Sequence, residues 1–422
     1  MYLLSMFAFR NLLRNWRRTL FTVCSLCLGV ALSIWTDNIT KGRADDIVNT
    51  VTSAYVGHFQ VSTERFRKDE LIQDYMKPEQ SQSFSGFISG GFSASGGSAR
   101  IHFPGLLSSG ENSLPIVLDG VQPRTEDQVT HLSKKLSRGE YLTDNTENTA
   151  PFDQCDERQI LISEEQAQKL NVGLGDKVVV MGQAADGSLG NDLFRVKGIY
   201  KTDSKAFDRR VSFTTLGCAA ALGQIQGPHE IVFGLSDTNL EAQVESELRN
   251  RAQAKGLVVT TWRESVPQLY SIVRFLRAIH NAINFILFLV ISVGIVNVMM
   301  MNVFERTREF GVMTALGTGR SQVVSLILFE TLGIAVIGLT LGSLIGSAVV
   351  TYHHFVGFDL HMFLGEQYSA GQFSLSMVVF PKVSLTSILR SGVITVAFML
   401  VAGLYPAWRA SKLTPIEAMR SL

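Results

Sequence analysis

Apolar residues gather in four long runs that are separated by polar stretches of the chain. The runs cover residues 20–36, 283–303, 323–350 and 388–408. A helix needs roughly 17–25 mostly apolar residues to cross the hydrocarbon core of a bilayer, and each run reaches that length. The last run is the least regular, because Arg390 lies near one end and Pro406 near the other. This pattern predicts four transmembrane helices.

The first run has a second interpretation, because basic residues precede a short apolar stretch, as they do in a cleaved signal peptide. The run is bounded by Trp35 and Asp37 rather than by a clear small-residue cleavage site. Beyond it, Ile47, Val48 and Val51 have the pattern of a helix that continues. These features favour a retained membrane helix over a cleaved signal.

Lys and Arg residues near the runs indicate the orientation of the chain, since cytoplasmic loops carry an excess of them. One side of the predicted helices collects Arg10, Arg14, Arg17, Arg18, Arg306, Arg308, Arg320, Arg409, Lys412 and Arg420. The loop at 351–387 on the opposite side has only Lys382, although Arg274 and Arg277 also lie on that side. We therefore predict that both termini are cytoplasmic and that residues 37–276 face outward.

The outward block has the pattern of a mixed α/β domain inserted between the first and second membrane helices. Strand-like runs occur at 57–61, 158–163, 176–182 and 193–200, and helical patterns occur at 163–170 and 239–256. Two stalk helices, one after Thr36 and one from about Pro267, would join this domain to the membrane. The Gly/Ser-rich stretch 83–100, with Phe84, Phe87 and Phe92, predicts a loose surface loop.

Composition and motifs limit the function. The net charge of +1 argues against a nucleic-acid binder, which needs a basic field to neutralise phosphates. The sequence contains no GxxxxGK[ST] loop, so we expect no nucleotide site in this chain. No residue spacing supports a catalytic constellation, a cofactor or a metal site, and the histidines at 353–361 match no metal pattern. We expect a chain that is not itself an enzyme.

The cysteines differ in position. Cys24 and Cys27 lie inside the first apolar run, where small packing residues are the default interpretation. Cys155 and Cys218 lie in the outward block, where an oxidising compartment would permit a disulfide. The sequence leaves open whether these two residues meet in space.

Glu330 lies about two turns into the third run, where an ionisable side chain is costly unless it faces protein or water. Two roles stay open for it, a structural bond to a neighbouring helix or a part in the mechanism. The same run carries Gly338, Gly342 and Gly346 at four-residue intervals. Glycines along one helix face let another helix approach closely, within the chain or across a dimer.

The connector between the second and third runs reads "ERTREFGVMTALGTGR" (305–320). Glu305 with Arg308, or Arg306 with Glu309, can pair on a helix surface at three-residue spacing. The segment also supplies an apolar face, which a merely solvated connector does not need. At this point the segment is either a solvated connector or a surface that a partner grips, and such a surface would involve Glu305, Arg306, Arg308, Glu309, Phe310, Gly311, Ala315, Leu316, Gly317 and Arg320, with Met313 on the same apolar face.

Several segments resemble the FtsX-like permeases, the MacB-type membrane subunits of ABC transporters that include the LolC/LolE lipoprotein-release proteins. "ERTREFGVMTALGTGRSQVVSLILFE" (305–330) resembles the family's cytoplasmic turn, and "YPAWRASKLTPIEAMRSL" (405–422) resembles its closing motif. "FRNLLRNWRRTLFT" (9–22) resembles its amphipathic first helix. "LNVGLGDKVVV", "FRVKGIYKT" and "VVTTWRESVPQL" resemble pieces of its periplasmic domain, as found in the LolC/LolE branch. The resemblance covers nearly the whole chain.

The resemblance and the apolar runs together imply the organisation of the chain. They predict a cytoplasmic amphipathic helix at 1–19, membrane helices at 20–36, 283–303, 323–350 and 388–408, a periplasmic MacB-like domain with stalks at 37–276, a coupling helix at 304–322, a periplasmic loop at 351–387 and a cytoplasmic tail at 409–422. The expected location is the bacterial inner membrane.

The resemblance further implies a permease subunit whose coupling helix docks on a separate cytoplasmic ATPase, which binds the ATP and Mg²⁺. ATP-driven closure of two such ATPases would move the stalks and the outward domains without a continuous channel, a mechanism called mechanotransmission. A second permease copy or a sister permease would complete the complex within the membrane lipids. The expected task is lipoprotein release from the inner membrane or export of a periplasmic substrate.

The branch within the family is open at this stage. In lipoprotein release, one permease carries a periplasmic hairpin that hooks a chaperone, and the matching segment here is "GQAADGSLGND" (182–192). That segment is short and polar, which argues against a hook. Three interpretations remain within the family. The chain has a LolE-like role without a hook, it exports a substrate with an outer-membrane partner, or it is a relative with other cargo. An FtsX-like regulator that moves no substrate and activates a cell-wall hydrolase is the alternative from another class.

Overall fold

A computed structural model describes residues 16–84, 86, 94–110, 112–143, 155, 157–202, 204–235, 240–360, 369–370, 373–374 and 378–412. The chain forms two compact units. The membrane unit comprises Met1–Asp45, Val273–Gly365 and Met377–Leu422, and the outward unit comprises Asp46–Ile272 and Glu366–Ser376. Residues 1–15, which carry most of the predicted N-terminal amphipathic helix, lie outside the described residues.

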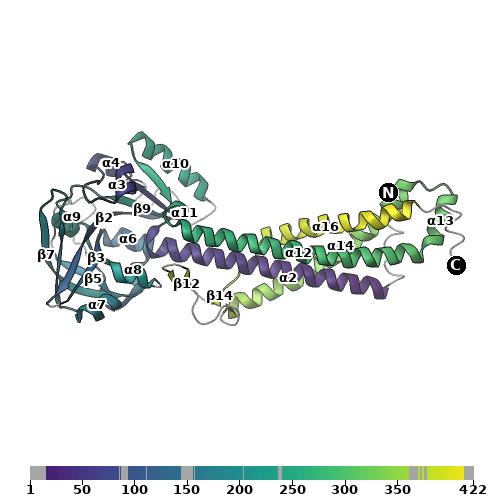
Figure 1. Ribbon diagram of the computed structural model, residues 1–422, viewed down its shortest axis with the longest axis horizontal. Helices are drawn as coiled ribbons and strands as arrows, with labels where there is room; N and C mark the ends of the chain where they lie inside the picture. The colour runs from purple at the N-terminus through teal and green to yellow at the C-terminus, as the bar shows by residue number, and fades with distance from the viewer. Residues whose placement is uncertain are drawn as a thin grey trace. The chain divides into compact units, whose positions relative to one another are not determined.

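The elements are numbered in chain order, and Figure 1 labels many of them. The helices are α2 (Trp16–Val51), η1 (Thr52–Val56), α3 (Glu64–Asp69), α4 (Pro78–Gln82), α6 (Pro123–Thr130), η2 (Leu132–Lys135), α7 (Glu164–Leu170), α8 (Lys205–Arg210), α9 (Leu216–Gly223), α10 (Glu241–Ala254), α11 (Trp262–Ser265), α12 (Pro267–Glu305), α13 (Thr307–Ala315), α14 (Arg320–Val356) and α16 (Leu385–Ser411). The strands are β1 (Phe59–Ser62), β2 (Ala94–Ser109), β3 (Asn112–Val121), β4 (Leu136–Gly139), β5 (Gln159–Ser163), β6 (Lys177–Gln183), β7 (Leu189–Tyr200), β8 (Val211–Thr215), β9 (Glu230–Leu235), β10 (Val258–Thr261), β11 (Phe358–Asp359), β12 (Ser369–Ala370), β13 (Phe373–Ser374) and β14 (Val378–Val379).

Among the described residues, the membrane unit contains four helices that are long and apolar enough to cross a bilayer. They are α2, α12, α14 and α16, which run side by side in Figure 1 and contain the four predicted apolar runs. Their shared core includes Leu26 and Ile34 of α2, Phe288 of α12 and Met399 of α16. The helices extend beyond the apolar runs; α2 and α12 each continue across the boundary between the two units.

The glycines of α14 face α2 of the same chain. A Cβ atom on Gly342 would lie 2.7 Å from the Cβ of Val30 and 2.8 Å from the carbonyl oxygen of Cys27. Gly338 and Gly346 meet Leu26 and Ala31 at similarly short distances. Because the obstacle at Gly342 includes backbone, a side chain there would push the helices apart. The four-residue glycine pattern therefore serves close packing within the chain.

Arg390, which interrupts the fourth apolar run, belongs to a polar cluster in the membrane unit. Its Nη1 atom lies 3.4 Å from Oδ1 of Asp37, and Nε2 of His280 lies 2.9 Å from the same oxygen. The side chain of Asn284 bonds His280 one turn along α12. These contacts join α2, α12 and α16, which explains how polar residues are accommodated at these positions.

In the outward unit, β2 takes part in two arrangements of strands. Its first half pairs with β9, which continues into β1 and β10 as an antiparallel sheet. Its second half pairs with β6, and the order β2–β3–β8–β5–β7–β6 returns to β2, which closes a six-stranded barrel. Gly105 lies where β2 meets β6, and a Cβ atom there would lie 2.5 Å from the carbonyl oxygen of Met181. Only glycine allows that approach.

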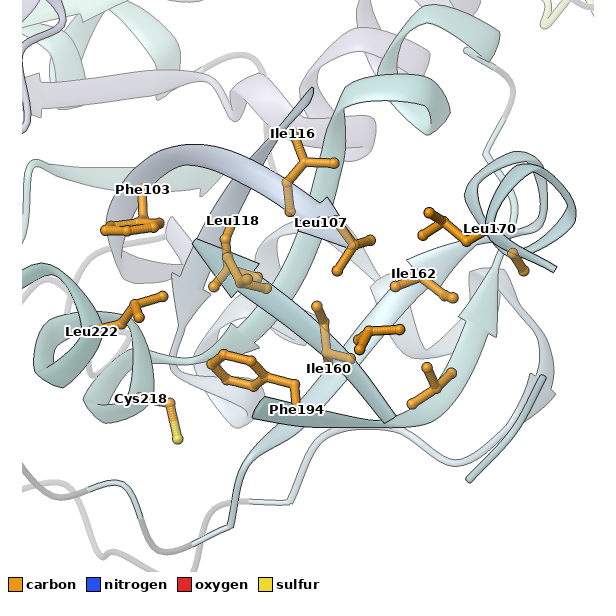
Figure 2. Packing of buried hydrophobic residues seen from close by; sticks show 14 of the residues in the cluster. Phe103, Leu107, Ile116, Leu118, Ile160, Ile162, Leu170, Phe194, Cys218 and Leu222 are labelled. Carbon is orange, nitrogen blue, oxygen red and sulfur yellow. The ribbon is translucent and has the colours of Figure 1, made fainter. Parts of the chain in front are cut away.

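The barrel interior is filled by side chains that alternate along the strands, as Figure 2 shows. Phe103 and Leu107 come from β2, Ile160 and Ile162 from β5, and Phe194 from β7. Leu170 of α7 and Leu222 of α9 extend this cluster beyond the strands. The predicted strands at 158–163, 176–182 and 193–200 correspond to β5, β6 and β7. The predicted helices correspond to α7, which Ser163 caps, and α10.

Two features of the outward unit were not predicted from the sequence. The expected loose loop at 83–100 was wrong for its second half, because residues 94–100 form the start of β2 and pair with β9. Phe84 is a buried core residue rather than a surface contact, whereas Phe87 and Phe92 lie outside the described residues. Cys155 and Cys218 form a disulfide, which the sequence had left open.

Candidate functional site

The connector between α12 and α14 contains one short helix, α13, which has a defined start and end. Arg306 breaks the helical path with φ −105° and ψ 14°, and α13 begins at the next residue. Gly317 has φ +92°, a value that L side chains rarely adopt, and it lets the chain turn into α14. The amide of Thr318 closes that turn by donating to the carbonyl of Met313 at 3.0 Å. The connector is therefore an ordered helical element.

Arg306 fixes the start of α13 to α14. Its Nη1 atom donates to Oε1 of Glu330 at 2.7 Å, and its Nε atom donates to Oε2 of Glu309 at 2.8 Å. The side chains of Arg306 and Glu330 are 8% and 6% exposed, so this ion pair is shielded from water. Burial alone would lower the pKa of Arg306, but Glu330 and then Glu309 outweigh it and raise that pKa above its ordinary value. The guanidinium is permanently charged.

Phe310 holds the same face of α13 against the membrane unit. It is 2% exposed and packs in a cluster with Val303 of α12, Val323, Leu326 and Ile327 of α14, and Ala407 and Ala410 of α16. The guanidinium carbon of Arg306 lies 5.1 Å from the centre of the Phe310 ring. The ion pair and the aromatic side chain thus anchor one face of α13 at two points.

The opposite face of α13 is exposed and partly apolar. Arg308, Val312 and Leu316 follow one another at four-residue spacing, which places them on one side of a helix. Val312 is 46% exposed and Leu316 is 83% exposed. Ala315 and Arg320 are exposed beside them. An exposed apolar pair bordered by arginines has the composition of a protein contact surface.

The structure divides the predicted docking residues between the two faces. Exposed residues are Glu305, Arg308, Glu309, Ala315, Leu316, Gly317 and Arg320, whereas Arg306, Phe310 and Gly311 are buried within this chain. Met313 is half-buried beside Phe310. Val312 was missing from the predicted docking residues, although its four-residue spacing from Arg308 and Leu316 was a usable signal. We name Arg308, Val312, Ala315, Leu316 and Arg320 the outer face of α13.

Glu330 takes the structural role that the sequence allowed, because its partner is Arg306 on the connector 24 residues earlier. The pair crosses from the end of α12 to the third turn of α14. The start of α13 is thereby joined to α14 through a buried, charge-assisted hydrogen bond, which is stronger than a neutral one.

The segment 182–192 comprises the end of β6, the turn at 184–188 and the start of β7. The amide of Ala185 donates to the carbonyl of Gly223 in α9 at 2.9 Å, and the amide of Ala184 donates to Ser188 at the same distance. Ala184 is buried, and Gly190 approaches the carbonyl of Leu222. The hairpin tip is thus tied to its own domain, whereas Leu189 at its edge is 74% exposed.

Comparison with known families gives two matches that together cover most of the chain. Residues 19–251 match the MacB-like periplasmic core domain, and residues 281–415 match the FtsX-like permease C-terminal domain. The second match contains all of α13, α14 and α16 and most of α12.

Individual relatives agree with these families. The chain is 25% identical over 329 residues to the lipoprotein-releasing system transmembrane protein LolC of Xylella fastidiosa, covering 74% of this chain and 75% of that protein. It is 33% identical over 140 residues to the macrolide export ATP-binding/permease protein MacB of Syntrophobacter fumaroxidans, covering 33% of this chain and 17% of that protein. The crystal structure of the periplasmic region of MacB from Actinobacillus actinomycetemcomitans matches with 14% identity and a TM-score of 0.37, covering 53% of this chain and 95% of that one.

Proposed function

The chain belongs to the FtsX-like permeases with a MacB-like periplasmic core domain, and from this membership we propose that it couples ATP hydrolysis by a partner subunit to movement of its outward unit. An ABC transporter permease of the MacB/LolC type is the function that the family supports. The observation that carries the coupling proposal is the two-sided packing of α13. One face is anchored in this chain, and the other is an exposed, partly apolar surface.

In this proposal, the outer face of α13 docks on a cytoplasmic ATPase that binds ATP and Mg²⁺. Leu316 and Val312 supply apolar contacts, and Arg308 and Arg320 border them with positive charge. The anchored face transmits the displacement: Arg306 acts on α14 through Glu330, and Phe310 acts on both α14 and α16. Since α12 runs without a break from Pro267 to Glu305, the same element also extends into the outward unit.

The substrate is proposed from the relatives. Similarity to a lipoprotein-releasing transmembrane protein favours extraction of a lipid-anchored protein from the outer leaflet, and similarity to a macrolide exporter keeps export of a periplasmic substrate as the broader class. The tethered hairpin at 182–192 favours a permease that does not itself hook a chaperone. A homodimer, or a heterodimer with a sister permease that carries the hook, completes the complex in this proposal.

The proposed orientation places α13 and both termini in the cytoplasm and the outward unit in the periplasm, because Lys and Arg dominate the α13 side of the helices. An alkaline phosphatase reporter fused after Leu422 is expected to be inactive, and one inserted at Gly110, in the β2–β3 turn, is expected to be active. The opposite pair of results would reverse the topology and remove the proposed contact of α13 with a cytoplasmic ATPase.

The docking proposal is tested by Leu316→Asp and Val312→Asp. Each change places a carboxylate in the apolar part of the outer face, so we expect at least about tenfold weaker binding of the partner ATPase, as for a contact residue near the centre of an interface. Affinity is measured between the detergent-solubilised permease and its cognate ATPase, and ATP hydrolysis by the reconstituted pair is measured in parallel.

Leu189→Asp is the matched control, because Leu189 is similarly exposed but lies in the outward unit. This variant is expected to bind the ATPase as the parent does. All variants should insert in the membrane at equal levels, since none of the three side chains is buried. Parental affinity of both α13 variants would show that the outer face is not the docking surface.

A further inference from the structure

The first stalk helix ends in an arrangement that the proposed coupling does not yet explain. Helix α2 continues into η1, a π-helical turn, and the chain leaves it at Gly57 with φ +65°. The last carbonyl groups of a helix have no partner within the helix and are usually left to water or to caps. Here, side chains of the outward unit donate hydrogen bonds to three of the carbonyl groups at the helix end.

Each of these side chains donates to a different carbonyl oxygen. Nζ of Lys135 donates to Ser53 at 2.7 Å, Nη1 of Arg100 donates to Tyr55 at 2.6 Å, and the side-chain amide of Gln60 donates to Val56 at 3.1 Å. Two of the three donors are cations, which is the charge that the negative end of a helix dipole favours. We name Lys135, Arg100 and Gln60 the stalk socket.

Arg100 is held rigidly within the outward unit. It is fully buried in the middle of β2, at the position that pairs with Glu230 of β9 and Val121 of β3. Its Nη2 and Nε atoms donate to the two carboxylate oxygens of Glu126 at 2.6 and 3.1 Å. Its guanidinium carbon also lies 4.5 Å from the centre of the Tyr55 ring. The residue thus links η1, α6 and the strand shared by the sheet and the barrel.

A second layer of buried charge supports Arg100. His102 of β2 lies 2.7 Å from Asp119 of β3 and 3.2 Å from Glu230 of β9. Glu230 also faces Arg100 at 3.5 Å. Phe66 stacks on the His102 ring with centroids 5.6 Å apart. This layer fixes Glu230, one of the two carboxylates beside Arg100, and so limits the positions that the guanidinium can take.

The simplest role for such a network is to stabilise its own domain. Buried ion pairs are a poor source of stability, however, because desolvating the charges offsets most of their attraction. What the network gains is a fixed geometry for Arg100, which donates to a carbonyl of the same helix end that Lys135 and Gln60 also contact. That convergence points to a mechanical role for the helix end rather than to general packing.

We propose that Arg100 and Lys135 are positioning residues that lock the end of the first stalk to the outward unit, so that the stalk end and the domain move as one body. This inference rests on the proposed coupling function, in which helix movement has to reach the outward unit. A joint whose carbonyls were left to water could bend or unwind at η1 and would dissipate the movement. The socket removes that freedom at the point where the helix ends.

The first experiment uses the full chain in nanodiscs and needs no ATPase. Lys135→Met keeps the aliphatic stem and removes the donor, and Lys135 is only half-buried, so the variant is expected to fold. Hydrogen exchange of amides 52–57 is expected to be about tenfold faster than in the parent, the change that fits loss of one charged hydrogen bond. Amides of β5 and β8 in the barrel should exchange at the parental rate.

Lys134→Met is the matched control, because Lys134 lies beside Lys135 in η2 but is exposed. It should leave exchange at 52–57 unchanged. Arg100→Gln, which removes a fully buried charge, is expected to give a larger increase at 52–57 than Lys135→Met. Parental exchange at 52–57 in Lys135→Met, or equal acceleration throughout the outward unit, would overturn the proposed socket.

The second experiment measures the joint during turnover. Spin labels at Asn49→Cys and Glu140→Cys, both exposed and within the outward unit, report the distance across the socket when Cys24 and Cys27 are replaced by alanine. We expect a narrow distribution in the free chain and in the complex that hydrolyses ATP, and a distribution about twice as wide in Lys135→Met. Broadening of the parent during ATP turnover would show that the joint bends in use and would overturn the proposal. A complex that shows no ATP turnover would instead count against the coupling function, while the free-chain comparison still tests the socket.

Discussion

Replacing Glu330 with alanine is expected to destabilise the membrane unit by roughly 3–5 kcal/mol, because the change leaves the buried Arg306 guanidinium without its main counter-charge. Arg306 cannot release its proton to relieve this cost, since a guanidinium stays protonated in proteins. The start of α13 should therefore leave its position on α14. The measurement is unfolding of the full chain in mixed micelles with increasing dodecyl sulfate, together with hydrogen exchange of α13 amides.

Two further variants separate the ion pair from general disturbance. Glu309→Gln removes the other carboxylate near Arg306, but this side chain is 43% exposed, so we expect a loss below about 1 kcal/mol. The double variant Arg306→Met with Glu330→Met removes both charges together and should be close to the parent in stability, as replaced buried ion pairs often are. A single Glu330→Ala variant as stable as Glu309→Gln would show that the pair contributes little to anchoring α13.

The outward unit is expected to be most stable near pH 6.5 and to lose stability on both sides of that value. Asp119 and Glu230 outweigh the effect of burial on His102 and raise its pKa from 6.5 to about 10. Its contribution is complete below pH 6.5 and is lost as the pH rises toward 10. Burial, together with the charge of His102, lowers the pKa of His229 from 6.5 to about 4, so its contribution is complete above pH 6.5 and is lost as the pH falls toward 4.

On each side of pH 6.5 the free energy of unfolding falls by several kcal/mol at most, since one pKa unit corresponds to about 1.4 kcal/mol. Glu230, whose pKa is lowered by His102 and Arg100 despite burial, adds to the loss at the acid end. The profile is measured by pulse proteolysis of the full chain in urea at each pH. His102→Gln should abolish the alkaline limb while lowering overall stability, and His229→Gln should weaken the acid limb. A parent whose stability is constant between pH 6.5 and 9 would contradict the assigned role of His102.

The sequence predicted what depends on local patterns. Four runs of sufficient length and hydrophobicity became α2, α12, α14 and α16. Alternation of apolar residues indicated β5, β6 and β7, and Ser163 marked the start of α7. The connector at 305–320 stood out because a charged segment also carried an apolar face. These properties follow from helix and strand periods and from bilayer thickness, which neighbouring residues determine among themselves.

Only the tertiary structure decided which residues meet across long distances in the chain. The start of β2 reads as a flexible Gly/Ser segment and becomes a strand because β9, more than 130 residues later, supplies its hydrogen-bond partners. Arg306 and Phe310 looked like docking residues, but Glu330 and the cluster around α14 and α16 bury them and leave Val312 and Leu316 on the outer face. Arg100 gave no signal in the sequence, since its meaning lies in Glu126, Glu230 and the end of the first stalk. Periodicity determines which elements form and which of their faces are apolar, whereas long-range pairing determines which polar residue is buried and against what.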